Sequence, residues 1–349
     1  MTEENKTETF PTLPAISIVM AAHDHEHELE SHLPILMEQD YPAGFEVIVV
    51  VSKGEDATDD LLERLRRQYA NLYTTFIPDS SRYMSRKKLA VTLGVKAAKN
   101  EWVLLTEPEC LPASPQWLRQ MASHCADGID MVMGYSNYDD ESTDYQRYER
   151  AMMQRKLLKE AQKTAYRSEG HNLLFRKNVF MEGRGFDGNA QYIRGEYDFL
   201  VNKYAKRGNT AVEQSREAWL IEDAPTRKKW SNRNLFYMCT RRHLKHSFRH
   251  RFLYNLCQTA KHLWYIVLLA AMAVTGIMQE WIFLGIAAGL WIATLWAHAI
   301  VGKKALAPYE PEISALKIVV MDLSRPWRAL YRKVKFLSAD KNDFTSHKL

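Results

Sequence analysis

The stretch from Ser85 to Leu118 constrains the fold of this chain more than any other. Its first half carries apolar residues at helical spacing after a basic start. Residues 102–105 then form a short apolar run, which is typical of a strand covered on both faces. Glu107 and Glu109 follow at once, on either side of Pro108. In open α/β sheets ligands bind beyond the carboxyl ends of the strands, so this acidic turn is placed where a ligand would bind.

The chemistry of this acidic turn allows two interpretations. Two carboxylates suit a divalent cation that is bound to a diphosphate, because hard cations take oxygen ligands and keep phosphate groups as partners. The alternative is a solvated acidic turn that binds nothing. The stretch alone does not decide between them.

The N-terminal part of the chain alternates between strand and helix patterns. Apolar runs rich in β-branched residues predict strands at Ala15–Ala22, Glu46–Val51 and Tyr73–Ile77. Helices are expected over Glu28–Glu38 and Asp56–Gln68. This alternation predicts a parallel sheet with right-handed crossovers. No GxGxxG follows any of these three strands, which disfavours a dinucleotide fold of the usual glycine-loop type.

A second pair of carboxylates lies later in the chain. A strand is expected at Asp130–Gly134 and a polar helix over Asp139–Lys163. A further helix opens near Arg194 and carries Glu196 and Asp198 in its first turn. Such carboxylates either complement the helix dipole or act as a catalytic base, and both interpretations stay open.

The C-terminal part predicts a membrane hairpin. Leu263–Met278 and Trp281–Val301 are almost wholly apolar, and each is close to the roughly 20 residues that span a bilayer. The alternative is a buried helical pair in a soluble core. Arg325–Leu337 interleaves basic with apolar residues, which suits a helix that lies on lipid headgroups, with Pro326 at its start. A solvated basic tail is the alternative for this last segment.

Charge supports the membrane interpretation. The chain carries a net charge of +5, and residues 227–261 contain ten Lys or Arg and no Asp or Glu. This block and Lys303–Lys304 flank the apolar pair, so the positive-inside rule places both flanks on the cytoplasmic side. We find no motif for nucleic-acid binding and therefore expect no nucleic-acid partner.

Cysteine usage and the N-terminus favour a cytosolic setting for the rest of the chain. The four cysteines show neither a CxxC pair nor zinc-site spacing, so we expect them to be reduced thiols. The N-terminal residues are polar and acidic, which is unlike a signal peptide.

Several ordered stretches resemble known sequences: residues 15–42, residues 85–118, GHNLLFRKNVF, RGEYDFLVN and CTRRH. The chain resembles a family 2 glycosyltransferase of the membrane-associated bacterial type, over Ala15 to Arg251. The resemblance implies a GT-A fold: an α/β, Rossmann-like, mostly parallel sheet, here with a C-terminal transmembrane helical hairpin.

The resemblance implies a reaction and a location. Members move a sugar from a nucleotide-sugar donor to an acceptor hydroxyl, usually with inversion, in cell-surface polysaccharide or glycolipid synthesis. We therefore expect a glycan or lipid-linked acceptor, membrane lipid as a partner, and a catalytic domain on the cytoplasmic face of the bacterial inner membrane.

The resemblance also implies roles for individual residues. Glu107 and Glu109 would hold Mg²⁺ or Mn²⁺, and Glu196 or Asp198 would be the catalytic base. The positions expected to contact the donor or to close over it are His23, Asp24, Asp56, Arg86, Lys87, Arg241, Arg242 and His243.

Three positions depart from the family pattern. Val51-Ser52-Lys53 stands where members carry aspartates, Glu-Pro-Glu replaces Asp-x-Asp, and Tyr197 occupies the usual position of the catalytic aspartate. These departures motivate a second hypothesis, a catalytically weakened GT-A domain that acts as a binding or assembly partner. A third is a nucleotide- or sugar-phosphate-binding enzyme of another reaction class on a similar sheet.

The predicted organisation follows the chain in order. It comprises a flexible tail at 1–13, a GT-A domain at 14–235, a basic juxtamembrane segment at 236–262, two transmembrane helices at 263–302, and a cytoplasmic amphipathic tail at 303–349.

Overall fold

A computed structural model describes residues 13–52, 56–77 and 85–344 of the chain. The chain forms two compact units. The described part of the first unit comprises residues 13–52, 56–77, 85–137 and 157–223, and that of the second comprises residues 138–156 and 224–344. The tail predicted at 1–13 lies outside the described residues except for Leu13, as do Lys53 and the last five residues of the predicted C-terminal tail.

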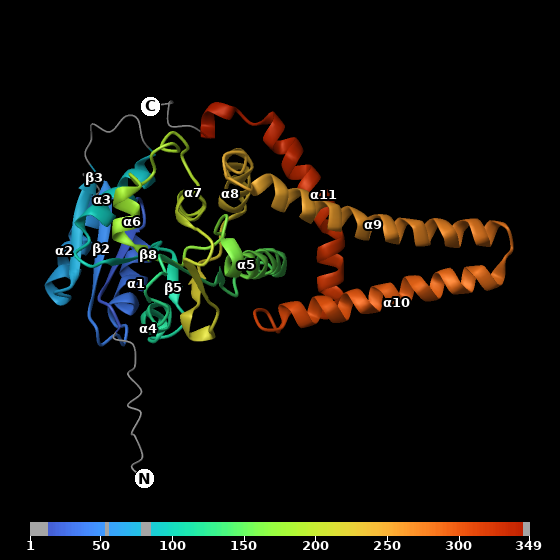
Figure 1. Ribbon diagram of the computed structural model, residues 1–349, viewed down its shortest axis with the longest axis horizontal. Helices are drawn as coiled ribbons and strands as arrows, with labels where there is room; N and C mark the ends of the chain where they lie inside the picture. The colour runs from blue at the N-terminus through green and yellow to red at the C-terminus, as the bar shows by residue number, and fades with distance from the viewer. Residues whose placement is uncertain (1–12, 53–55, 78–84, 345–349) are drawn as a thin grey trace, which may run out of the picture. The chain divides into compact units, whose positions relative to one another are not determined.

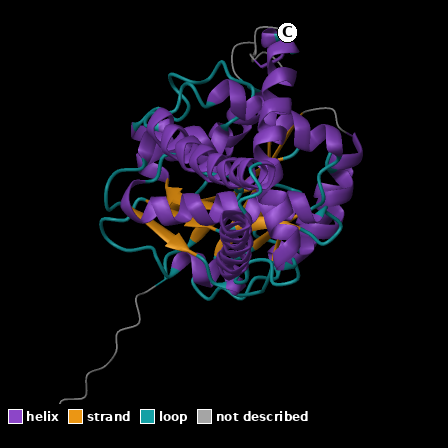
Figure 2. Ribbon diagram, turned by 90° about the vertical axis from the view of Figure 1, so that its right-hand side faces the viewer, coloured by secondary structure: helices purple, strands orange, loops and turns teal. Residues whose placement is uncertain are grey.

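The first unit is built on one large sheet. Within the described residues it has seven strands in the order β3-β2-β1-β4-β8-β6-β9 (Figures 1 and 2). The strands β1 to β4 run parallel, β8 is antiparallel to β4 and β6, and β9 is parallel to β6, which confirms the predicted mostly parallel sheet. The strands are β1 Ile16–Ala21, β2 Phe45–Ser52, β3 Leu72–Ile77, β4 Trp102–Thr106, β6 Met131–Gly134, β8 Leu173–Arg176 and β9 Thr210–Glu213.

A smaller sheet continues from the acidic turn. It has the strand order β5-β10-β7, with β5 at Cys110–Pro112, β10 at Leu220–Glu222 and β7 at Ser136–Tyr138. β5 and β10 are antiparallel, and Cys110 is the register partner of Glu222. This pairing brings the acidic turn next to a segment that lies over a hundred residues away in the sequence.

Helices cover both faces of the large sheet because side chains alternate along each strand. On β1, Ile16, Ile18 and Met20 join the buried core that also contains α1 and α2 residues. The intervening residue Val19 faces α3 instead. The helices of this unit are α1 Glu26–Met37, α2 Asp56–Gln68, α3 Arg86–Ala97, α4 Trp117–Ala122, α6 Lys177–Glu182 and α7 Glu196–Tyr204, with a 3-10 turn at Arg216–Ala218.

The second unit is helical. Its elements are α5 Asp144–Thr164 (whose last residues belong to the first unit), α8 Arg227–Thr240, α9 Ser247–Ile277, α10 Trp281–Leu306, α11 Ala315–Ser338 and a 3-10 turn at Lys341–Phe344. Figure 1 shows α9 and α10 side by side as a hairpin, and Trp264 Nε1 of α9 donates to Thr294 Oγ1 of α10 at 3.2 Å. Among the described residues, these two helices are long and apolar enough to cross a membrane. Only 11% and 6% of their apolar windows are buried, unlike the core helices of a soluble protein.

Asp322 of α11 ties the helices of this unit together. Its carboxylate accepts a hydrogen bond from Tyr148 of α5 at 3.2 Å, contacts His298 Nε2 of α10 at 2.8 Å and pairs with Lys261 of α9. Arg325 NH1 lies 3.4 Å from it, one helical turn along. Burial alone would raise the pKa of Asp322, but these partners hold it well below the ordinary value.

The expectation that Pro326 begins the last helix is wrong. α11 begins at Ala315, after the N-cap Ser314, and continues through Pro326. A proline inside a helix costs roughly 3 kcal/mol, because it removes a hydrogen bond and crowds the preceding turn. Contacts of α11 with α8 and α10, together with the charge network at Asp322, offset this cost.

The contact of α3 with the sheet depends on Gly94. A Cβ at this position would lie 2.3 Å from Val19 Cγ1 and 3.2 Å from Val50 Cγ2. The missing side chain therefore allows the helix to approach β1 and β2 closely.

Gly94→Val should lower the Tm of the full-length protein, because overpacking a core costs about 1–3 kcal/mol. The matched control is Ala97→Val, which adds bulk to the same helix at an exposed position. Circular dichroism in detergent measures both variants. Equal losses of Tm in the two would contradict the close packing of α3 on the sheet.

Candidate active site

The candidate site lies at the carboxyl ends of β1 and β4. These strands are parallel neighbours, with Met20 opposite Thr106, so the loops that follow them meet at the same edge of the sheet. His25, in the first loop, brings its Nε2 to 3.4 Å from Glu109 Oε1 in the second. Burial lowers the pKa of His25, but the hydrogen bond and charge of Glu109 outweigh it, so the pKa is raised.

The acidic turn is buried and surrounded by partners. Glu107 and Glu109 are only 4% and 8% exposed, so the solvated loop is not what the structure shows. Lys87 of α3 places its Nζ 2.6 Å from Glu107 Oε1. The Nδ1 of His32 lies 2.8 Å from the carbonyl oxygen of Pro108 between the two glutamates. Buried carboxylates require such partners, because an uncompensated buried charge is costly.

The acidic turn fits a divalent cation. Each carboxylate has two oxygens that can accept several hydrogen bonds or coordinate a metal. Lys87 and His25 each approach one oxygen of their partner, Oε1 of Glu107 and of Glu109. Hard oxygen donors of this kind are the ligands that Mg²⁺ and Mn²⁺ prefer.

Other predicted donor residues lie around this edge. His23 and Asp24 follow β1 and are both exposed, and Asp24 has a φ of +56°. Arg86 is exposed at the start of α3. Asp56 begins α2, but its side chain lies outside the description. Ser52 ends β2, and its buried hydroxyl oxygen has no hydrogen-bond partner among the described residues.

Three predicted donor residues lie in the second unit. Arg241 is the C-cap of α8, and Arg242 and His243 follow it. Their place next to the acidic turn therefore stays a prediction.

The second carboxylate pair opens α7. Gly195, just before the helix, has a φ of +98°, which favours glycine. Asp198 lies 3.2 Å from Arg167 Nε, and Glu169 pairs with the same guanidinium. Burial raises the pKa of Asp198 to about 6, against the opposing effect of the Arg167 charge. Asp198 is therefore held in a buried ion pair.

Tyr197 points toward the acidic turn instead. Its ring centroid is 4.9 Å from that of His171. Burial, and after it the negative charge of Glu107, raises the pKa of Tyr197 well above its ordinary value. Tyr197 is thus a neutral hydroxyl at physiological pH and cannot serve as a base.

Glu196 is the less constrained carboxylate of the pair. It is 4% exposed, and its Oε1 has no hydrogen-bond partner in the part of the chain that is described. Buried polar atoms are nearly always paired in folded proteins, so this oxygen differs from the carboxylate of Asp198, which pairs with Arg167. Sequence patterns gave no means to separate Glu196 from Asp198.

Lys88 holds together parts of the chain around the site, and no sequence pattern predicted this. It is fully buried, and its Nζ donates at 2.7 Å to the carbonyl oxygens of Asn189 and Tyr192. The same ammonium lies 4.6 Å from the ring centroid of Phe199. Burial lowers its pKa to about 8, although Glu196 acts in the opposite direction. Lys88 therefore fastens the loop before α7 to α3. The sequence carries only an indirect indication of this role, because a lysine is unusual among the apolar residues on the buried face of a helix.

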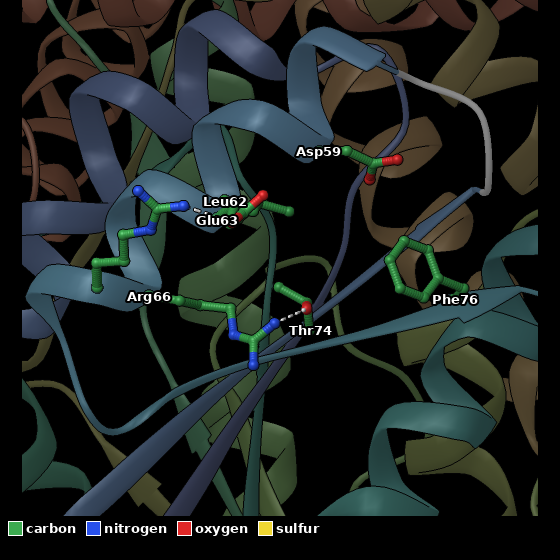
Figure 3. A pocket seen from close by; sticks show the side chains of 7 residues that line it. Asp59, Leu62, Glu63, Arg66, Thr74 and Phe76 are labelled. Atoms are coloured by element: carbon green, nitrogen blue, oxygen red, sulfur yellow. Dashed lines mark hydrogen bonds and ion pairs between the residues drawn. The ribbon is translucent and has the colours of Figure 1, made fainter.

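A groove of about 470 Å³ is lined by other residues of the first unit (Figure 3). It runs between α2 and β3, where Arg66 NH1 lies 3.5 Å from Thr74 Oγ1. It contains none of the predicted site residues. The lining residues are Asp59, Leu62, Glu63, Arg66, Arg67, Thr74 and Phe76.

Comparison with known families decides the assignment. The model of glycosyl transferase family 21 matches residues 1–332. The chain belongs to glycosyl transferase family 21. It is therefore a glycosyltransferase, as expected, whereas membership of family 2 is not confirmed.

A solved structure shows the same fold. The mannosyltransferase PcManGT from Pyrobaculum calidifontis, in complex with GDP-Man and Mn²⁺, is 19% identical with a TM-score of 0.54, over 93% of this chain and 87% of that one. TarS 1–349 from S. aureus, in complex with UDP, is 16% identical over 63% of each chain, with a TM-score of 0.44. The first likeness confirms the predicted GT-A fold, and the second is too distant to add to it. No curated protein matches the chain.

The raised pKa of Asp198 predicts a pH dependence of stability. Between about pH 4 and 6 the folded protein keeps a proton on Asp198 that the unfolded chain has released. This residue therefore makes stability fall as pH rises through that window, with a slope of at most about 1.4 kcal/mol per pH unit. Asp198→Asn cannot titrate and should lack this contribution.

The measurement is the Tm of the wild type and of Asp198→Asn from pH 4 to 7. The difference, variant minus wild type, should increase up to about pH 6 and then level off. Asp127→Asn removes an exposed carboxylate and serves as the control. A difference that does not change with pH would show that Asp198 titrates normally.

Proposed function

We propose that this glycosyltransferase is membrane-associated and moves a sugar from a nucleotide-sugar donor to the hydroxyl of a glycan or lipid-linked acceptor. The observation that carries the proposal is the buried acidic turn of Glu107 and Glu109 beside Lys87 at the carboxyl end of β4. Ligand binding at that edge is the rule for open α/β sheets. The GDP-Man and Mn²⁺ in the structure of PcManGT support a nucleotide sugar and a divalent cation as the ligands.

The donor diphosphate would bind at the acidic turn. Glu107 and Glu109 would hold Mg²⁺ or Mn²⁺, which when bound stabilises the negative charge of the leaving diphosphate. Lys87 already approaches Glu107 and would share its charge with a phosphate oxygen. We infer that His23, Asp24, Asp56 and Arg86 line the nucleotide end, and that Arg241, Arg242 and His243 close over the diphosphate or acceptor.

Glu196 is the better candidate for the base. Its Oε1 has no partner among the described residues, whereas Asp198 is paired with Arg167. In the proposed step, Glu196 accepts the proton of the acceptor hydroxyl, and the acceptor oxygen attacks the anomeric carbon. The bond from that carbon to the diphosphate oxygen breaks, and the nucleoside diphosphate leaves. Attack on the face opposite the leaving group would invert the anomeric configuration.

Membrane association is supported by the second unit. α9 and α10 expose large apolar side chains along their length, including Ile277, Ile282 and Trp296. Basic residues flank them, so both ends of the hairpin would lie on the cytoplasmic side of a bacterial inner membrane. α11 exposes Trp327, Leu330 and other apolar residues that would lie among the lipid headgroups. The acceptor would then belong to cell-surface polysaccharide or glycolipid synthesis.

Glu196→Gln should lower kcat by about 100-fold or more, because a general base contributes typically 10²–10⁴ in rate. Donor affinity should change little, since the amide keeps the size of the side chain. Release of nucleoside diphosphate from a panel of UDP-, GDP- and TDP-sugars with Mn²⁺ measures turnover. Glu182→Gln, at an exposed position of α6, is the control.

The alternative function is a catalytically weakened domain that acts as a binding or assembly partner. Ser52 and Tyr197 favour it, because each replaces an acidic residue of the resembled pattern. The same panel separates the two functions. Donor binding without turnover in the wild type would favour the alternative, and the absence of any nucleotide-sugar binding would rule out the enzyme.

A further inference from the structure

Cys110, His171 and Glu222 converge beside the acidic turn from three separate segments. Cys110 begins β5, and Glu222 ends β10 directly opposite it in the antiparallel pair. His171 lies in the loop that leads into β8. Cys110 and Glu222 are buried, at 3% and 4% exposure, and the His171 side chain is 17% exposed. The fold therefore brings a thiol, an imidazole and a carboxylate together in a largely enclosed place.

The spacing of the ligand atoms suits a tetrahedral metal ion. His171 Nδ1 lies 3.8 Å from Cys110 Sγ and 3.3 Å from Glu222 Oε2. All three atoms lie within 4.8 Å of one another. Zinc bonds of about 2.3 Å to sulfur and about 2.0 Å to nitrogen and oxygen, at tetrahedral angles, place such ligand atoms roughly 3.3–3.6 Å apart. To reach this geometry, the distance from Cys110 Sγ to His171 Nδ1 would shorten by a few tenths of an ångström. The distance from Cys110 Sγ to the carboxylate of Glu222 would shorten by less than about 1.5 Å.

The arrangement differs from that of a catalytic triad. In a triad, one ring nitrogen of the histidine faces the nucleophile and the other faces the carboxylate. Here the same nitrogen, Nδ1, faces both Cys110 and Glu222. Convergence of all three groups on one point is the geometry of chelation.

We propose that Cys110, His171 and Glu222 form a binding site for Zn²⁺ that is distinct from the donor cation site at Glu107 and Glu109. A thiolate and an imidazole select zinc-like ions, whereas Mg²⁺ and Mn²⁺ prefer oxygen ligands. Three protein ligands leave a fourth position for water or another oxygen ligand. Zinc-site spacing is absent from the sequence because the ligands come from distant segments: Cys110 and His171 are 61 residues apart in the chain.

The site has a structural consequence that is independent of the proposed sugar transfer. A bound ion would join β5, β10 and the loop that carries His171, whose ring contacts Tyr197 of α7. Because the unfolded chain does not hold these ligands together, zinc should stabilise the folded protein.

The test uses full-length protein in detergent after chelator treatment, titrated with Co²⁺ as a spectroscopic probe. We expect one Co²⁺ per chain to bind with a thiolate-to-cobalt charge-transfer band in the near ultraviolet. Zn²⁺ should abolish the band and raise the Tm, and excess Mg²⁺ should leave the band in place.

Substitutions locate the ligands. Cys110→Ser should abolish the charge-transfer band, and Glu222→Gln should weaken metal binding by more than the roughly 10- to 100-fold cost of losing an outer-shell partner. Cys125→Ser is the matched control, since it removes a partly buried thiol elsewhere in the same unit. Glu109→Gln should leave the band unchanged, which separates this site from the donor site.

Two outcomes would overturn the proposal. One is a band that survives in Cys110→Ser or disappears equally in Cys125→Ser. The other, which needs no variant to fold, is an X-ray absorption spectrum of the zinc-loaded wild type without sulfur in the first coordination shell. A failure of sugar transfer would leave both measurements untouched, so this inference and the proposed function fail separately.

Discussion

The structure depends on the stabilisation of two glutamates, Glu107 and Glu109, that are buried at the end of β4. Buried carboxylates need opposite charges and hydrogen bonds, because their desolvation otherwise costs several kcal/mol each. α3 supplies Lys87 to Glu107, and the loop after β1 supplies His25 to Glu109. These partners arrive because β1 is the parallel neighbour of β4, and because Gly94 lets α3 approach the sheet closely.

The first three residues of α7 lie in three different surroundings. Successive residues of a helix point about 100° apart, so adjacent side chains face different surroundings. Tyr197 faces His171, Asp198 faces Arg167, and Glu196 keeps one buried oxygen without a partner among the described residues. Loss of an aspartate at position 197 therefore does not remove every carboxylate that could serve as a base.

Sequence patterns predicted the sheet well, because the central strands are short apolar runs buried on both faces. They also predicted the acidic turn at the carboxyl end of a buried strand, whereas the role of Lys87 was implied by the resemblance alone. They failed where distant packing decides the outcome. Pro326 lies inside α11 because tertiary contacts offset its local cost. Neither the pairing of Asp198 with Arg167 nor the convergence on His171 follows from local spacing, since both depend on how separate loops meet.

The central claim is that the buried acidic turn binds the donor diphosphate through a divalent cation. Anomalous diffraction at the manganese edge tests it most directly, on crystals of the full-length protein grown with Mn²⁺ and a nucleoside diphosphate. We expect a manganese peak within coordination distance of a carboxylate oxygen of Glu107 or Glu109 and of the diphosphate. A nucleotide bound elsewhere, or a manganese peak that touches neither glutamate, would contradict the account.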